Sequence, residues 1–239
     1  TFQEKYDIQS TNLSKNNIGI INFHLKQTLY FIKSILYIII LKYVKITSPY
    51  SQRYKSLYFT RYPKHFNDNE RDSKYGSLFQ DDDYYLISII ADGFHQKLNL
   101  TDYYNCLKRL KRASFKYILI DSYLSIGDGI KALFYSFKLY KKSRIIRDNS
   151  FIFDNIDITD HVRLELFTSL QRIPRLMMYH KGFIGFINNN IIDRFILYLF
   201  EFAYGRYFTY LLRKYSPNTI ITGFQHGPNS QRHIMFFLG

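Results

Sequence analysis

The residue types best suited to chemistry stand together in the string Gly223-Phe224-Gln225-His226-Gly227-Pro228, near the end of the chain. Residues 219–222 before it predict a strand. Glycines on both sides of Gln225 and His226 allow a sharp turn in which backbone approaches a ligand closely. A histidine in that turn could act as a general base, donate to a phosphate or bind a sugar hydroxyl; a structural histidine that closes the turn is the alternative. We expect His226 to be catalytic, with substrate against Gln225 and Gly227.

Two charged residues further upstream are also candidates. Glu201 ends an apolar run over residues 196–200 and could serve as a general base. Arg206 could contact a phosphate or an acidic sugar. Alternatively, the two side chains pair on a helix surface, although a separation of five residues is slightly off the usual helical spacing.

Three more candidates come from earlier loops, because ligands of parallel sheets bind beyond the carboxyl ends of the strands. Arg61 follows the first predicted strand and could bind phosphate. Asp121 ends a later predicted strand and could bind a sugar hydroxyl, although capping of the next helix is the favoured alternative. His95 lies in a turn after an apolar segment, either as a site residue or as an ordinary loop residue.

Several common catalytic signatures are absent from the sequence. It has no Gly-x-x-x-x-Gly-Lys-Ser/Thr phosphate loop, no Gly-x-Gly-x-x-Gly fingerprint, no Gly-x-Ser-x-Gly elbow and no His-Glu-x-x-His zinc helix. Its one cysteine, Cys106, excludes an internal disulfide and a Cys-built zinc site. Asp81, Asp82 and Asp83 suit a helix N-terminus better than a metal ion. We therefore expect no metal and no cofactor, and a reducing, cytoplasmic location.

Apolar runs and helical periodicities alternate along the chain. Strands are predicted over residues 56–60, 115–122, 151–153 and 219–223, and helices over residues 84–91, 102–112, 130–139, 159–171 and 204–215. Thr159 and Asp160 are the N-cap candidates of the fourth helix. Strands that alternate with helices predict an α/β fold, with a Rossmann-like, largely parallel sheet flanked by helices.

A change of composition near residue 50 predicts that the chain has two parts. Residues 1–50 form a basic helical segment that is apolar from Leu29 to Val44, and residues 51–239 form a Rossmann-like domain. Lys33 and Lys42 leave too short an apolar run for a membrane span. A buried or interfacial helix is favoured, and a basic surface helix on anionic lipid is the alternative. Because the chain begins with Thr1 and ends in an apolar run, we expect a fragment.

The composition indicates a folded chain with anionic partners. Of the 239 residues, 46% are hydrophobic and 19% aromatic, which is enough apolar area for a core. The 33 basic residues against 19 acidic ones give a formal net charge of +14. This charge favours nucleic acid, nucleotide phosphates or an acidic membrane face as partners. The aromatic residues fall mainly within apolar runs and are expected in the core, so we do not expect nucleic acid.

Short strings at the predicted strand ends carry a family resemblance. They are Phe59-Thr60-Arg61-Tyr62-Pro63, Lys74-Tyr75-Gly76, Asp92-Gly93-Phe94-His95-Gln96, Leu119-Ile120-Asp121-Ser122-Tyr123, Glu201 with Gly205-Arg206, and the final Gly223-Phe224-Gln225-His226-Gly227-Pro228. Together these strings resemble bacterial surface-carbohydrate biosynthesis proteins of the glycosyltransferase type, as in capsule and O-antigen assembly. The similarity extends over residues 56–232, and its most specific element is the final string.

The resemblance implies a transferase of two Rossmann-like domains, of which residues 51–239 would be the acceptor-side domain, truncated before a nucleotide-sugar domain. It implies transfer of a sugar or related group from a nucleotide-activated donor to a saccharide or lipid-linked acceptor, in the cytoplasm or peripherally on the inner face of the membrane. The donor is a substrate, so no cofactor is implied. The residues implied are His226 or Glu201 as general base, and Arg61, His95, Asp121, Arg206, Gln225 and Gly227 as substrate contacts. The alternative is a basic accessory domain without catalysis that binds nucleic acid or a membrane surface.

Overall fold

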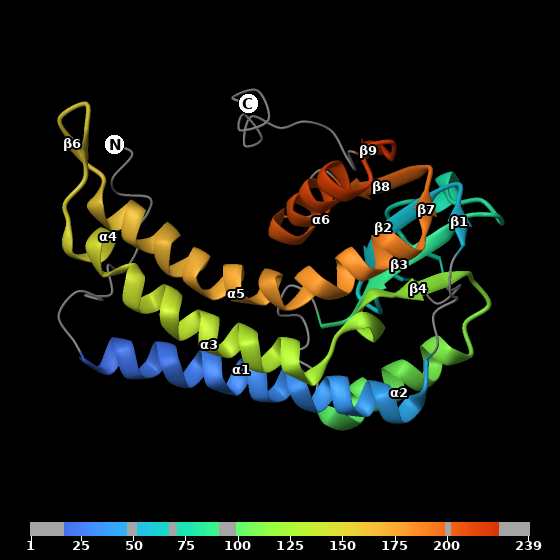
Figure 1. The fold of residues 1–239 in the computed structure, drawn as a ribbon, viewed down its shortest axis with the longest axis horizontal. Helices are drawn as coiled ribbons and strands as arrows, with labels where there is room; N and C mark the ends of the chain where they lie inside the picture. Colours follow the sequence, from blue (N-terminus) through green and yellow to red (C-terminus); the bar gives the residue numbers. More distant parts are fainter. Residues whose placement is uncertain (1–16, 47–51, 67–70, 91–98, 199–201, 225–239) are drawn as a thin grey trace.

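A five-stranded parallel sheet forms the centre of the protein (Figure 1). The computed structural model describes residues 17–46, 52–66, 71–90, 99–198 and 202–224. The strands are β2 (Leu57–Arg61), β3 (Tyr84–Ser88), β4 (Tyr117–Leu119), β8 (Arg194–Tyr198) and β9 (Ile220–Phe224), in the order β4-β3-β2-β8-β9. Every neighbouring pair in this sheet is parallel. The predicted α/β fold with a parallel sheet and flanking helices is therefore confirmed.

The strand order reverses between β2 and β8. From β2 the chain proceeds outward through β3 to β4, and it then crosses back through a long helical connection to β8 on the other side of β2. From β8 it continues to β9, in the opposite direction across the sheet. This is the strand order of doubly wound nucleotide-binding sheets, which bind ligands where the order reverses. The carboxyl ends of β2 and β8 are thus the place where a site is expected.

Both faces of the sheet are packed with aromatic rings. Tyr58 of β2 faces Tyr75 and Phe79, which come from the loop that follows β2. Its neighbour Phe59 faces the other way and contacts Phe208 of α6 (Phe202–Tyr215). Because consecutive side chains of a strand point to opposite faces, this alternation buries all five residues of β2.

The helix predicted over residues 84–91 is wrong, since these residues begin with β3. The segment Tyr84–Ser88 is rich in aromatic and aliphatic side chains, and it is buried between β2 and β4, where strand pairing satisfies its backbone. Asp83 does not begin a helix: its carboxylate accepts from the backbone N–H of Gln80 at 3.0 Å, in the turn before the strand. An apolar run of this length is short for a helix, and its tertiary pairing made it a strand.

Two helices agree with the prediction and carry complete capping boxes. Asn99 caps α2 (Leu100–Lys111) together with Asp102. Ser125 caps α3 (Ile126–Lys142) together with Asp128. In each box the cap side chain accepts from the N3 backbone N–H, and the N3 carboxylate accepts from the cap backbone N–H, so two otherwise unsatisfied donors are paired.

The connection from α3 to β8 differs more from the prediction. After α4 (Arg144–Asp148), strands β5 (Ile152–Phe153) and β6 (Ile156–Asp157) form an antiparallel hairpin outside the main sheet. Asp154 and Asn155 have positive φ, as a two-residue hairpin turn requires. Helix α5 (Thr159–Asn189) follows. The N-cap predictions were wrong: Ile158 holds the cap position, and the carboxylate of Asp157 accepts from the Thr159 N–H.

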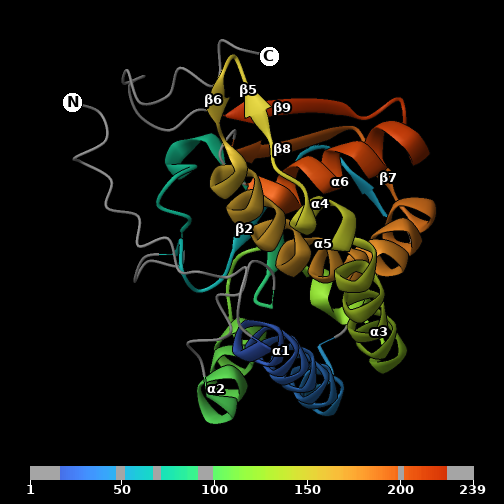
Figure 2. The same cartoon turned by 90° about the vertical axis from the view of Figure 1, so that its left-hand side faces the viewer.

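Helix α1 (Asn17–Val44) belongs to the same fold as the sheet. It lies beside α2 at the bottom of the molecule (Figure 2), and it runs alongside α3, which it contacts (Figure 1). Its buried residues join the core cluster that contains the sheet. The short strands β1 (Arg53–Tyr54) and β7 (Ile191–Ile192) pair in parallel outside the main sheet. The boundary predicted near residue 50 lies within residues 47–51, outside the described residues.

Candidate functional site

Only three of the sequence-predicted site residues lie in the described part of the chain. Arg61, Asp121 and Arg206 are described. The other five, Glu201, His95, Gln225, His226 and Gly227, lie outside the described residues, although β8 and β9 end directly before the segments that contain Glu201 and His226. Their roles stay predictions.

A buried polar cluster lies at the carboxyl ends of β2 and β8. We call it the Asp72 cluster; it consists of Thr60, His65, Asp72, Lys74 and Tyr198. Thr60 is the next-to-last residue of β2, and Tyr198 is the last residue of β8. The other three come from the loop between β2 and β3. The sheet thus brings together two strand ends that are far apart in sequence.

Asp72 is the centre of this cluster. It is fully buried, and both of its carboxylate oxygens accept hydrogen bonds. The hydroxyl of Thr60 donates to Oδ2 and the hydroxyl of Tyr198 donates to Oδ1. The backbone N–H groups of Lys74 and Tyr75 also donate to Oδ1, at 2.8 and 3.1 Å. Four donors compensate for the burial of this carboxylate and fasten the loop to both strands.

Aromatic packing holds the loop in place above the strand ends. The ring of Tyr75 stacks on that of Tyr198, with centroids 4.2 Å apart. The Tyr75 hydroxyl donates to the carbonyl of Phe59 in β2 at 2.8 Å. On the same Tyr198 ring, the Nζ atom of Lys74 lies 4.3 Å from the centroid, which is within the range of a cation–π interaction.

His65 is a neutral imidazole in this cluster. Its Nδ1 lies 3.4 Å from the Thr60 hydroxyl oxygen, whose own proton goes to Asp72. That oxygen can therefore only accept from Nδ1–H, which assigns the tautomer and makes Nε2 the acceptor atom. Burial, which is the largest cause, and the nearby cations Lys74, Arg61 and Lys64 together lower the pKa of His65 to about 3. A group with such a pKa accepts hydrogen bonds but is a weak general base.

Arg61 and Arg206 contribute positive charge near this edge. Arg61 is the last residue of β2; it is buried, and its charge acts on His65. Arg206 is exposed near the beginning of α6, the helix that follows β8. The structure thus gives Arg61 and the Asp72 cluster a common location at the point where strand order reverses.

Asp121 forms a separate cluster at the ends of β3 and β4. We call it the Asp121 cluster; it comprises Ser88, Ile89, Ile90, Asp121 and Tyr179. The hydroxyls of Ser88 and Tyr179 donate to Oδ1 at 2.9 and 2.6 Å, and the backbone N–H groups of Ile89 and Ile90 donate to Oδ2 at 2.7 and 3.1 Å.

Helix capping by Asp121 was the wrong alternative, because Ser125 caps α3. Asp121 is fully buried, and its bonds hold the end of β3 against β4 and α5. The segment with His95 begins directly after this bonded end of β3. Asp121 therefore fixes the position of the last described residues before His95.

Sequence reasoning had missed most of the Asp72 cluster. Thr60 and Tyr198 stand at strand ends, which is a usable signal once the strands are known. His65 and Asp72 lie in an irregular loop and follow no motif, so that only the folded chain shows their proximity. Within the described ranges, no three His, Cys, Asp or Glu side chains come close enough to hold a metal ion.

Comparisons with known proteins identify no relative. No family model matches the chain, and neither does any curated protein or solved structure. The proposed function therefore rests on the fold and on the geometry of the strand ends.

Proposed function

We propose that this protein binds a phosphate-bearing, hydroxyl-rich ligand at the carboxyl ends of β2 and β8. The observation that carries this proposal is the position of the Asp72 cluster and Arg61, at the reversal of strand order in a parallel sheet. Ligands of such sheets bind at this reversal. The neighbouring cations suit a diphosphate, and the acceptor atom of His65 suits a sugar hydroxyl.

In full, the proposed activity is sugar transfer in surface polysaccharide biosynthesis, at the cytoplasmic side of the membrane. That the transferred group is a sugar rests on the resemblance of the strand-end strings. The proposed position of the donor at β2 and β8 rests on the strand order instead, and it differs from the acceptor-side role that the resemblance implies for this domain. A base removes the proton of an acceptor hydroxyl, whose oxygen bonds to the sugar carbon of the donor. The bond from that carbon to the diphosphate breaks, and the nucleoside diphosphate leaves. The base is His226 or Glu201, because the low pKa of His65 fits it for binding instead.

Binding of nucleoside diphosphates and nucleoside diphosphate sugars to the purified chain tests this proposal. We expect titration calorimetry to detect binding of at least one member of a panel that covers the common bases. Arg206→Ala should then weaken binding about tenfold, the usual effect of a lost charge-assisted phosphate contact. Arg213→Ala is the matched control, because Arg213 is also exposed but lies at the other end of α6, and it should leave affinity within about twofold.

Two results would contradict the proposed function. The first is that no member of the panel binds to a chain that is folded by circular dichroism. The second is that Arg206→Ala and Arg213→Ala weaken binding equally, which would indicate general attraction to a basic protein instead of a site near α6.

A further inference from the structure

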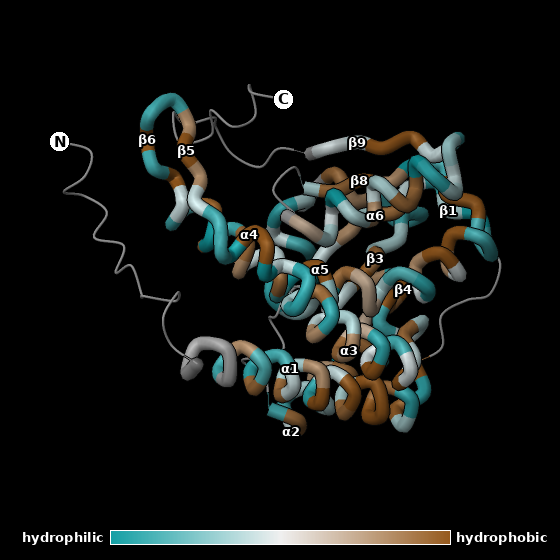
Figure 3. Tube along the Cα trace, turned by 60° about the vertical axis from the view of Figure 1, so that its left-hand side comes forward, coloured by the Kyte–Doolittle hydropathy of each residue, from teal (hydrophilic) through white to brown (hydrophobic). Residues whose placement is uncertain are grey.

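Helix α1 has two apolar faces, of which the described part of the chain covers only one. The buried face packs into the core; it consists of Phe23, Tyr30, Phe31, Tyr37, Ile38 and Leu41. On the opposite side lies an exposed stripe with alternating separations of four and three residues. The stripe consists of Leu25, Leu29, Ile32, Leu36, Ile39 and Tyr43, which are 39–77% exposed. Apolar residues recur along most of α1, which lies at the outside of the fold (Figure 3).

The length and charge of α1 suit a membrane surface. Among the described residues, one helix is long and apolar enough to cross a membrane, and it is Asn22–Val44, with 39% of its most apolar window buried. Residues 17–46 contain four lysines and no Asp or Glu. An apolar stripe with basic residues beside it is the pattern of helices that lie in the interface of anionic bilayers.

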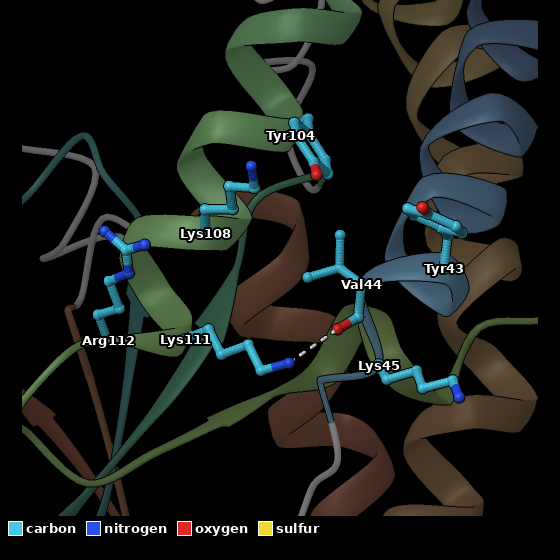
Figure 4. A pocket seen from close by; sticks show the side chains of 7 residues that line it. All are labelled: Tyr43, Val44, Lys45, Tyr104, Lys108, Lys111 and Arg112. Atoms are coloured by element: carbon cyan, nitrogen blue, oxygen red, sulfur yellow. Dashed lines mark hydrogen bonds between the residues drawn. The ribbon is translucent and has the colours of Figure 1, made fainter.

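A basic pocket continues the stripe at the end of α1. Its volume is about 510 Å³, and it lies between the C-terminal ends of α1 and α2 (Figure 4). The described residues that line it are Tyr43, Val44, Lys45, Tyr104, Lys108, Lys111 and Arg112, none of them acidic. Tyr43 belongs to both the stripe and the pocket, so that the two form one continuous surface.

The cations of the pocket have different local roles. Lys111 donates from Nζ to the carbonyl of Val44 at 3.3 Å and thereby caps the end of α1. Lys108 lies over the ring of Tyr104, with Nζ 4.4 Å from the centroid. Lys108, Lys111 and Arg112 are all exposed. Four cations around one recess, beside an apolar stripe, match the phosphate and acyl chains of an anionic lipid.

We propose that α1 docks the protein on an anionic bilayer, with the exposed stripe among the acyl chains and a lipid phosphate in the basic pocket. A second copy of this chain fits the surface less well, because it would bring two basic pockets of a +14 protein together. A span across the bilayer would require α1 to leave the core. The stacked rings of Tyr37 and Tyr103, 4.1 Å apart, and the contact of Ile35 with Gly129 hold it there.

Vesicle sedimentation of the full 239-residue chain tests this inference. Vesicles of phosphatidylcholine alone are compared with vesicles that also contain phosphatidylglycerol. We expect the chain to bind the mixed vesicles at least about tenfold more tightly, with the difference reduced by added salt. Alkaline carbonate should release the bound protein, as it releases peripheral proteins.

Two pairs of double variants separate the contributions of stripe and pocket. Leu29→Glu with Leu36→Glu should reduce binding to both vesicle types at least about tenfold. Its control, Phe153→Glu with Ile156→Glu, introduces the same charges at apolar residues of the β5–β6 hairpin that are even more exposed, and it should bind normally. Lys108→Glu with Arg112→Glu should remove the preference for phosphatidylglycerol, whereas Arg213→Glu with Lys214→Glu on α6 should keep most of it. Circular dichroism confirms that each variant is folded.

The same experiments can overturn the inference. If the wild-type chain binds neither vesicle type, the inference is wrong. If it binds both types equally tightly, the role of the pocket is wrong. Resistance to carbonate would indicate insertion of α1 instead of docking. If the chain does not bind vesicles but is an oligomer that the Leu29 and Leu36 changes dissociate, the stripe is a self-association face.

Discussion

The Asp72 and Asp121 clusters have the same construction but different surroundings. Each has a fully buried aspartate that accepts from one Thr or Ser hydroxyl at a strand end, one Tyr hydroxyl and two consecutive backbone N–H groups. Asp72 lies where the strand order reverses, beside His65 and several cations. Burial is the largest influence on the pKa of Asp121 and raises it. The groups that act in the opposite direction are neutral hydrogen-bond donors.

Under the proposed function, Asp72 belongs to a ligand site, whereas Asp121 serves the fold. Both clusters join segments distant in sequence, and both therefore stabilise the fold. Only the Asp72 cluster lies at the expected ligand position and has positive charge beside it. Variants at matching positions of the two clusters should therefore have similar effects on stability and different effects on ligand binding.

The largest expected effect is on stability at Asp121. Asp121→Ala removes the carboxylate that accepts from two hydroxyls and two backbone N–H groups in a closed interior. We expect the free energy of unfolding to fall by about 4 kcal/mol. Urea denaturation measures it. A loss below about 1 kcal/mol would show that water or neighbouring groups replace the carboxylate.

The matched tyrosines give the sharpest comparison. Tyr198→Phe and Tyr179→Phe each remove one hydroxyl that donates to a buried carboxylate, so each should cost about 1.5 kcal/mol of unfolding free energy. Tyr198→Phe should also weaken nucleoside diphosphate binding severalfold, whereas Tyr179→Phe should not. Equal effects of both variants on binding would remove the functional distinction between the clusters.

The two clusters should respond to pH in opposite directions. Burial raises the pKa of Asp121, so above about 3.8 the folded state holds this proton more tightly than the unfolded state, and the contribution of Asp121 to stability falls as pH rises. The pKa of His65 is lowered to about 3, so its contribution is complete above about 6.5 and is lost as pH falls toward 3.

Urea denaturation between pH 4 and pH 7 measures both contributions. Relative to the wild type, Asp121→Asn should gain stability as pH rises, whereas His65→Gln should gain it as pH falls. Parallel curves for wild type and either variant would contradict the corresponding pKa shift.

The smallest expected effect concerns the cation that only the Asp72 cluster contains. Lys74→Met keeps most of the side-chain stem but removes the charge over the Tyr198 ring, so stability should fall by about 0.5 kcal/mol. Because Lys74 lowers the pKa of His65, that pKa should rise in the variant. Titration of the His65 ring protons by NMR measures the rise, and an unchanged pKa would show that Lys74 does not act on the imidazole.

Strands β2, β4 and β9 and the two capped helices could be predicted from sequence, but the site could not. Local signals identify these elements, and tertiary contacts reinforce them. The signals are the apolar run Leu57–Arg61 for the strand and the cap residues Asn99 and Ser125 for the helices. The segment Tyr84–Ser88 was mispredicted because its apolar run fits either structure, and pairing with two neighbours decided it. His65 and Asp72 gave no signal, since a loop has no periodicity.

The sequence by itself determined the class of the fold, the basic character of the protein and the absence of the common phosphate-loop and hydrolase signatures. These depend on composition, spacing and local hydrogen bonding, which a chain carries whether it is folded or not. Only the tertiary structure decided that Asp72 and Asp121 are equivalent in construction, and that the described residues leave one face of α1 exposed. Both depend on which segments the sheet brings together, and that pairing is set by burial of the whole core.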